Sequence, residues 1–373
     1  VEGLKHIWGR TDLIPLWVAD MDFATAPFVT DAIRKRCENE VLGYTGKPDS
    51  YYNAIINWVK QRYDLIVTKE VINFVPGIVP GIGMAMNCFT QKGDKVMIQP
   101  PVYHPFAWVT TRNERTLVIN PLRWENGMYR MDLDAFREQI KGCKLFILCN
   151  PHNPGGVVWT EAELRAIADI CYDEKVLVFS DEIHADLTLP PHTHRPFATV
   201  SEKARMNSVT FMSPSKAFNM PGLSASHALI FNEDLRKRFR IYMDAGELDM
   251  GHVFAFLSVE AAYSHGTEWL DQCLAYIQGN IDFVDEFLKK HAPKIKAIRP
   301  EASYLVWLDC RELELSQKDL NEFFVDKAHL ALNDGEMFGK EGIGFMRLNV
   351  ASPRCIIEKA MKQLADAYQL YIK

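Results

Sequence analysis

The sequence predicts an α/β fold built on a mostly parallel sheet, and three observations support this. Short apolar runs alternate with helical patterns through the middle of the chain, which is the rhythm of strand–helix–strand units. The apolar runs are nearly continuous, as expected for strands buried on both faces. Polar residues follow several of these runs directly, at the end of the strand where such sheets bind ligands.

Four apolar runs are predicted to form strands of this sheet. They are residues 95–99 (KVMIQ), 144–149 (KLFILC), 176–180 (VLVFS) and 209–213 (VTFMS). The second runs into a turn-rich NPHNPGG segment, the third into Asp181, and the fourth into Pro214-Ser215-Lys216. Asn153, Asp181 and Lys216 each follow a strand, so we expect them to meet in one crevice.

A helix is expected between the second and third of these strands. Thr160 begins it, because Glu163 stands three residues on and completes a capping box. The helix carries an apolar stripe, made of Leu164, Ile167, Ile170 and Cys171.

The pattern changes near residue 262, where we expect a smaller α+β domain. Long helical stretches cover residues 268–292 and 355–371, with short strands at 304–310 and 344–350. The predicted division is a large domain at 31–261 and a small domain formed by 1–30 together with 262–373.

Composition excludes several classes of protein. The formal net charge of the 373 residues is −6 and no long basic block occurs, which argues against nucleic acid as a partner. No apolar run approaches the about 20 residues of a membrane span. The eight cysteines form no CxxC pair, which indicates reduced, buried thiols and a cytoplasmic location.

The crevice residues have the chemistry that pyridoxal phosphate (PLP) needs. The cofactor requires a lysine amine for a Schiff base, an acid facing its pyridine nitrogen, and a cradle for its phosphate. Lys216 fits the first role and Asp181 the second, although an aspartate paired with an arginine is an equally good interpretation of that residue. The segment 77–86 (GIVPGIGMAM) fits the third, because Gly77 allows a tight turn and Pro80 suits a first helical turn.

At this point the motifs resemble a known family. They are LWVADMDF (16–23), GYTG (43–46), PPVYHPF (100–106), NPHNPGG (150–156), SDEIHADL (180–187), SPSKAFNMPGL (213–223) and RLNVASPR (347–354). The chain resembles fold-type I PLP enzymes of the class I/II aminotransferase superfamily, and within it the carbon–sulfur lyases of the cystathionine β-lyase (MalY/PatB) type. The resemblance covers the chain from one end to the other.

The resemblance implies roles around the cofactor ring. Lys216 would be the Schiff-base lysine and proton shuttle, and Asp181 would pair with the pyridine nitrogen. Asn153 would bond the ring hydroxyl. His184 stands where aminotransferases usually carry a tyrosine, and Tyr103 would stack on the ring.

It also implies a phosphate cradle and a substrate site. Ser213, Ser215 and the amides of Ile78 and Val79 would hold the phosphate. Tyr44 would reach the phosphate of a neighbouring subunit, which implies a homodimer. The substrate would meet four residues, with Arg347 as the clamp of its carboxylate: Arg347, Asn153, Ala19 and His104.

Two positions depart from the pattern of relatives. Ser224, eight residues after Lys216, stands where aminotransferases carry an arginine that neutralises the phosphate. His104 stands where relatives often have a second tyrosine that points at the substrate side chain.

The expected activity is α,β-elimination on L-cystathionine, L-cysteine or S-substituted cysteines, giving pyruvate, ammonia and a thiol. The alternatives are an aminotransferase on the same fold and a lyase that doubles as a regulatory binding protein. An NAD-dependent dehydrogenase does not fit, because Gly77, Gly81 and Gly83 lack the GxGxxG spacing. No metal is expected, since neither DEIH nor the histidines at 192 and 194 belong to a complete ligand set.

Overall fold

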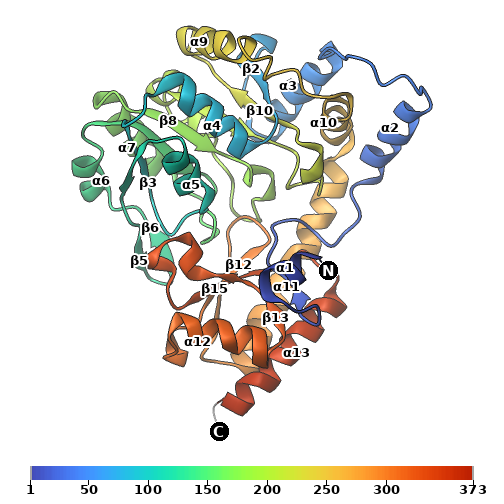
Figure 1. Ribbon diagram of the computed structural model, residues 1–373, viewed down its shortest axis with the longest axis vertical. Helices are drawn as coiled ribbons and strands as arrows, with labels where there is room; N and C mark the ends of the chain where they lie inside the picture. The colour runs from blue at the N-terminus through green and yellow to red at the C-terminus, as the bar shows by residue number, and fades with distance from the viewer. Residues whose placement is uncertain (1, 372–373) are drawn as a thin grey trace.

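The computed structural model describes residues 2–371, and its largest feature is a seven-stranded sheet (Figure 1). The strand order is β2-β10-β9-β8-β7-β3-β4. Only β10 runs antiparallel to its neighbours, so the expected mostly parallel sheet is confirmed. The strands are β2 (Ile72–Val75), β3 (Lys95–Ile98), β4 (Thr116–Ile119), β7 (Cys143–Cys149), β8 (Leu177–Asp181), β9 (Ser208–Met212) and β10 (Ser226–Leu229).

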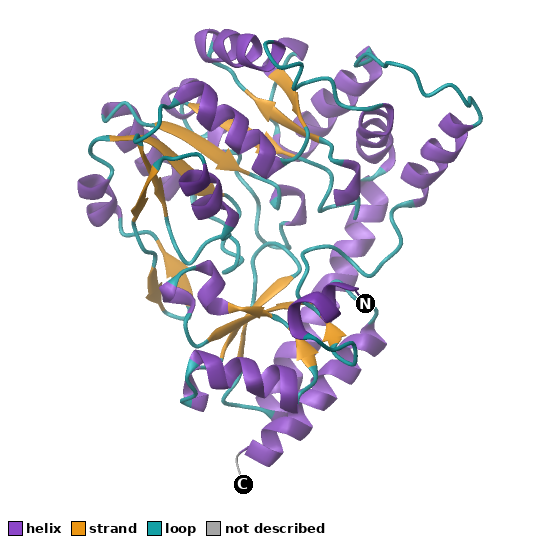
Figure 2. Cartoon of the chain, viewed as in Figure 1, coloured by secondary structure: helices purple, strands orange, loops and turns teal. Residues whose placement is uncertain are grey.

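Helices cover both faces of this sheet (Figure 2). In β7, Leu145 and Ile147 belong to the apolar cluster of one face, while Phe146 and Leu148 belong to that of the other. This alternation is the two-residue period of a strand, and it confirms burial on both sides. The covering helices include α4 (Ile78–Phe89), α5 (Pro105–Arg112), α6 (Leu133–Gln139), α7 (Glu161–Asp173), α8 (Glu202–Met206) and α9 (Glu233–Asp244).

A four-stranded antiparallel sheet lies below the large one in Figure 1, in the order β11-β12-β15-β14. Its strands are β11 (Lys296–Ile298), β12 (Leu305–Asp309), β14 (Asn333–Asp334) and β15 (Phe345–Asn349). The two long helices expected near it are α11 (Thr267–His291) and α13 (Arg354–Tyr371). The domain boundaries themselves stay a prediction.

The remaining elements connect these layers. Helices α2 and α3 pack against α10, and β1 pairs with β13, which brings the N-terminal segment to the small sheet. Their bounds are α1 (Glu2–Trp8), β1 (Ile14–Pro15), α2 (Pro27–Cys37), α3 (Asp49–Tyr63), β5 (Arg123–Glu125), β6 (Met128–Arg130), α10 (Val253–His265), α12 (Gln317–Glu322) and β13 (Leu330–Ala331). Within residues 2–371, no helix combines the length and apolarity needed to cross a bilayer.

The cysteines are unpaired, and most of them are buried as expected. Cys37 and Cys355 are exposed, however, so the prediction of buried thiols is wrong for these two. Cys37 ends α2, and Cys355 lies in the first turn of α13, where the side chain faces away from the core.

The expected capping box at the start of α7 is present. The Thr160 hydroxyl accepts a hydrogen bond from the Glu163 amide at 3.2 Å, and the Glu163 carboxylate accepts one from the Thr160 amide at 2.8 Å. These bonds satisfy donors that a helix start otherwise leaves free. The cap fixes where α7 begins after the NPHNPGG turn.

Thr160→Ala should lower the free energy of unfolding by about 1 kcal/mol, because it removes the acceptor for the Glu163 amide. Thr160→Ser keeps that acceptor and serves as the control. Urea denaturation of the three proteins measures the difference. Equal stability of the Ala and Ser variants would contradict the assigned cap.

Candidate active site

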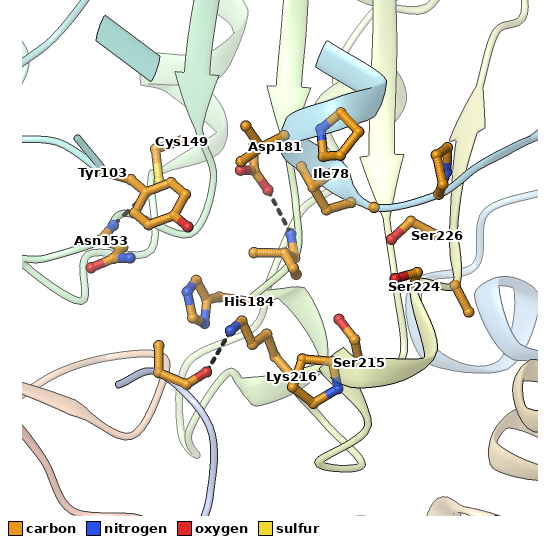
Figure 3. A pocket seen from close by; sticks show the side chains of 18 residues that line it. Ile78, Tyr103, Cys149, Asn153, Asp181, His184, Ser215, Lys216, Ser224 and Ser226 are labelled. Carbon is orange, nitrogen blue, oxygen red and sulfur yellow. Dashed lines mark hydrogen bonds between the residues drawn. The ribbon is translucent and has the colours of Figure 1, made fainter. Parts of the chain in front are cut away.

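A pocket of about 210 Å³ lies where the large sheet's parallel strands end (Figure 3). Asp181 is the last residue of β8, Asn153 follows β7, and Lys216 follows β9. All three line the pocket, so the predicted convergence is confirmed. They meet because the carboxyl ends of neighbouring parallel strands lie at one edge of a sheet.

Lys216 is largely buried and has no carboxylate partner among the described residues. Its Nζ donates a hydrogen bond to the carbonyl oxygen of Ala19, which also accepts from the Tyr304 hydroxyl at 3.0 Å. Burial, together with the nearby positive charge of Arg347, lowers the pKa of Lys216 to about 8. An amine with this pKa is partly uncharged near neutral pH, as a nucleophile or proton acceptor needs to be.

Asp181 is a buried carboxylate, 3% exposed. Its Oδ1 accepts a hydrogen bond from the Ile183 amide at 3.1 Å, and no arginine or lysine of residues 2–371 forms an ion pair with it. The alternative of an aspartate paired with an arginine is therefore wrong. Burial raises the pKa of Asp181 to about 7. A cationic ring placed in the pocket would supply the charge that this carboxylate lacks.

Hydrogen bonds on the side away from the pocket hold the segment after Asp181 in place. Glu182 is fully buried and accepts hydrogen bonds from the Ser180 hydroxyl, the Phe197 amide and the ring of His194, each at 2.8 Å. His194 is therefore a structural partner of Glu182. Across the described chain, no group of three His, Cys, Asp or Glu side chains is arranged to hold a metal ion.

Arg347 lies on β15 and is 4% exposed. Its Nη1 donates to the Asn153 side-chain oxygen at 3.0 Å, and its Nη2 donates to the Asn333 oxygen at 2.5 Å and to the Trp17 carbonyl at 3.0 Å. These acceptors are all neutral, and Nε is buried without a partner. Burial lowers the pKa of Arg347 to about 10, so it still carries its charge at neutral pH. A carboxylate is the ligand that this site lacks.

Two side chains flank the space between Lys216 and Asp181. His184 is buried, its Nδ1 has no partner in the described chain, and burial lowers its pKa to about 3, so the ring is neutral. Tyr103 lines the same pocket beside Asn153 (Figure 3) and packs edge-on against Phe106 at 5.7 Å between ring centroids.

The opposite end of the pocket contains the first turn of α4 and a group of serines (Figure 3). Gly77 has φ of 135°, a conformation that glycine adopts readily, and Ile78 and Val79 begin the helix. Ser215 lines the pocket. Ser213 does not: its hydroxyl donates to the Ala225 carbonyl at 2.7 Å, and its oxygen lies 2.9 Å from the Ser215 oxygen. Ser213 therefore orients Ser215 rather than facing the pocket.

Four predicted residues do not line the pocket: Arg347 and Ser213, described above, and Tyr44 and His104. Tyr44 is 98% exposed, in the loop between α2 and α3. His104 lines a neighbouring cavity beside Phe338, and its ring lies 4.4 Å from that of Trp108. By contrast, Ala19 lines the pocket as expected.

Sequence reasoning missed seven pocket residues: Pro76, Cys149, Ile183, Pro221, Ser224, Ala225 and Ser226. Ile183 and Pro221 lie inside quoted motifs but were given no role, Ser224 was noted only as a departure, and the other four lie just outside the motifs. Ser226 reaches the pocket through the pairing of β10 with β2, which no local pattern in the sequence indicates.

A comparison with protein families identifies the fold and the site together. Residues 11–364 match the model for aminotransferase class I and II. The chain belongs to this family. Within it, the chain is 38% identical to cystathionine beta-lyase PatB of Bacillus subtilis, over 97% of this chain and 94% of that protein. It is 30% identical to the protein MalY of Escherichia coli, over 96% and 93%.

A solved structure with a similar fold supports this family assignment. Cystalysin from Treponema denticola, whose structure contains pyridoxal 5'-phosphate, superposes with a TM-score of 0.96 at 33% identity, over 100% of this chain and 95% of that chain.

The burial of Asp181 predicts a specific pH dependence of stability for the ligand-free protein. An unfolded chain releases the aspartate proton near its ordinary pKa of 3.8, but the folded protein keeps it until about pH 7. Between these values the folded state holds the extra proton, so the free energy of unfolding falls as the pH rises. Asp181→Asn should remove this part of the decline.

Denaturation series at about pH 5 and about pH 8 measure the effect, because they bracket the change in charge. The Asn variant should gain stability relative to the parent at the higher pH. If the difference in free energy of unfolding between the Asn variant and the parent were the same at both pH values, the carboxylate would not be forced to ionise in a buried site.

Proposed function

We propose that this chain is a PLP-dependent carbon–sulfur β-lyase that acts on L-cystathionine, L-cysteine or S-substituted cysteines. The products would be pyruvate, ammonia and a thiol. Relatives that match nearly the whole chain are named cystathionine beta-lyase. The observation that carries the proposal is the pair in one pocket: a buried Asp181 without a counter-charge and a Lys216 amine with a lowered pKa.

The described residues fit the cofactor. Asp181 would hold its pyridine nitrogen protonated, which satisfies the carboxylate that burial leaves unpaired. Asn153 has its side-chain oxygen bonded to Arg347, which leaves its NH₂ group to donate to the ring hydroxyl. His184 and Tyr103 would flank the ring. At the other end, Ser215 and the first amides of α4 would receive the phosphate.

Bound PLP supplies an electron sink for the substrate α-carbon. Lys216 would hold the cofactor through its amine and, once a substrate amine has taken its place, remove the proton from the α-carbon. Its hydrogen bond to the Ala19 carbonyl aims Nζ away from Asp181 in the free protein. Breaking the bond between the β-carbon and sulfur then releases the thiol.

Arg347 would fix the orientation of the substrate by binding its α-carboxylate. The bonds from Arg347 to Asn153, Asn333 and Trp17 hold the guanidinium plane still before a substrate arrives, so little side-chain entropy is lost on binding. His104 remains our candidate for a residue that affects the choice of leaving group from its neighbouring cavity.

We further propose a cytoplasmic homodimer. Tyr44 would reach the phosphate of the neighbouring subunit, and its 98% exposure in one chain supports this role, as does the exposure of Val41 and Leu42 beside it. An exposed apolar segment of this kind is typical of an interface. The proposed division is residues 31–261 for cofactor binding, with 1–30 and 262–373 closing over the substrate.

Purified protein with L-cystathionine and no keto acid should form pyruvate and a thiol. Lys216→Ala should lose this turnover together with the Schiff-base absorbance that borohydride abolishes, because no other amine lines the pocket in the described chain. Lys203→Ala, a surface lysine paired with Asp173, is the control and should behave as the parent. Turnover that needs a keto acid and yields no pyruvate would instead establish an aminotransferase.

Arg347→Ala should raise KM for amino acid substrates by about tenfold or more, because a charged hydrogen-bonded pair with the carboxylate is lost. Arg311→Ala provides the control, since Arg311 pairs with Asp309 and stacks on Trp124 outside the pocket. Steady-state kinetics measure both. An unchanged KM in Arg347→Ala would place the carboxylate clamp elsewhere.

A further inference from the structure

A second cavity lies beside the candidate active site and is larger than the pocket itself. Its volume is about 390 Å³, against about 210 Å³ for the pocket. His104 lines this cavity, while the preceding residue, Tyr103, lines the pocket. Phe338 forms part of the cavity wall, and the centroid of its ring lies 4.9 Å from Cζ of Arg347. The cavity therefore adjoins the place where the substrate carboxylate is expected.

The walls of this cavity come from two parts of the fold that are tied together. One wall is formed by the end of β3, the start of α5 and the edge strand β4, and the other by the segment 336–341. The Val102 amide donates to the Phe338 carbonyl at 2.8 Å. Gly339, with φ of 125°, lies so near Pro100 that a Cβ on this glycine would stand 2.7 Å from that of the proline. The cavity is therefore formed in advance, and binding a ligand there costs little ordering of the chain.

Much of the lining is apolar. Ile98 and Val102 are buried at the base of the cavity, and Leu117 of β4 and the ring of Trp108 add to the same wall. Methylene groups placed against these side chains are removed from water, which favours binding. The apolar wall thus suits the aliphatic part of a ligand.

Two polar atoms of the lining are buried without a partner in the described chain. They are Nδ1 of His104 and Oε1 of Glu341. Burial lowers the pKa of His104 to about 4, so its ring is neutral at neutral pH. A buried carboxylate oxygen without a donor is destabilising, and native proteins retain one chiefly where a ligand or water completes it. Glu341 therefore points to a ligand that carries N–H donors.

A cation stands next to this carboxylate. Lys340 is exposed and lines the cavity, and because His104 is neutral it is the one cationic side chain among the described lining residues. Glu336, the other acid of the lining, is exposed. A ligand group that carries both an ammonium and a carboxylate would meet Glu341 and Lys340 together.

We propose that this cavity binds the far end of the substrate and selects thioether substituents that end in an α-amino acid, as the homocysteine half of L-cystathionine does. The inference rests on the proposed function, in which this substituent leaves as a thiol. Glu341 binds the distal ammonium and Lys340 the distal carboxylate, while the apolar wall packs against the methylene groups between them and the sulfur. The cavity adds a substrate preference and takes no part in breaking the carbon–sulfur bond.

The test compares L-cystathionine with S-propyl-L-cysteine, which keeps the thioether and methylene groups but lacks the distal amino acid. Glu341→Gln should lower kcat/KM for L-cystathionine by about tenfold, as expected for a hydrogen bond between charged groups, and leave S-propyl-L-cysteine unchanged. The loss should appear in KM and not in kcat, because the distal contacts are the same in the bound substrate and in the transition state. Pyruvate formation measures both substrates.

Two further substrates separate the roles of the two charges. S-(2-aminoethyl)-L-cysteine carries only a distal ammonium, and S-(2-carboxyethyl)-L-cysteine carries only a distal carboxylate. Glu341→Gln should raise KM for the first and leave the second unchanged. Lys340→Gln should do the reverse, by only about threefold because Lys340 is exposed, and this effect should shrink at high salt.

Binding to the cofactor-free protein gives a measurement that does not depend on turnover. Titration calorimetry should find the Kd for L-cystathionine about tenfold higher in Glu341→Gln than in the parent. Glu312→Gln is the matched control, because Glu312 pairs with Lys296 and does not line the cavity. Thermal denaturation should find Glu341→Gln at least as stable as the parent, since the substitution removes a buried carboxylate oxygen that lacks a donor.

The outcomes separate this subsite from the proposed function. If folded Glu341→Gln changed kcat/KM equally for L-cystathionine and S-propyl-L-cysteine, or for neither, the distal subsite would be overturned while the lyase assignment stood. If the parent released pyruvate from neither compound, the proposed function itself would fail.

Discussion

The site depends on one constraint: the Asp181 carboxylate is buried at the end of β8 without a positive partner in the described chain. Burial of a carboxylate in this way is unfavourable, and the raised pKa of about 7 is its direct consequence. In the proposed function, the cationic ring of the cofactor would offset this unfavourable burial. The same reasoning applies to Arg347, whose guanidinium has only neutral acceptors.

The surrounding structure keeps these groups in place when no ligand compensates them. Glu182 ties the chain immediately after Asp181 to Ser180, Phe197 and His194 on the far side of the segment. A few residues on, the Asp186 carboxylate accepts from the Trp58 indole at 3.0 Å. Asp181, Ile183 and His184 of this short segment thus line the pocket, while Glu182 and Asp186 form hydrogen bonds in the protein interior. The interior bonds prevent Asp181 from turning out to solvent, which would otherwise relieve its burial.

Much of this could be predicted from the sequence, because it depends on local pattern. Asp181 and Lys216 follow apolar runs that the sequence identifies as strands. Because the carboxyl ends of parallel strands lie at one edge of the sheet, residues that follow them are expected to lie close together. The orientation of His104 could not be predicted, because it is set by Phe338 from a distant segment. Neither could Ser226, since its place beside α4 follows from the pairing of β10 with β2. The proposed role of Tyr44 would depend on a second chain, which no pattern within one chain describes.

The two ends of the pocket offer different groups to the cofactor: a buried carboxylate at one end and neutral hydrogen-bond donors at the other. This difference matters because of the two roles proposed for Lys216. In the proposed function its amine would serve as an anchor and as a base, and it could not do both at once. While Lys216 moved a proton, retention of the cofactor would depend on Asp181 at one end and on neutral donors at the other. An arginine at position 224 would strengthen the second end. With Ser224 there, the buried charge of Asp181 would provide a larger share of the cofactor's binding energy, and that charge would also keep the ring electron-poor. Under the proposed function, therefore, retention of the cofactor and its activation would depend on the same carboxylate.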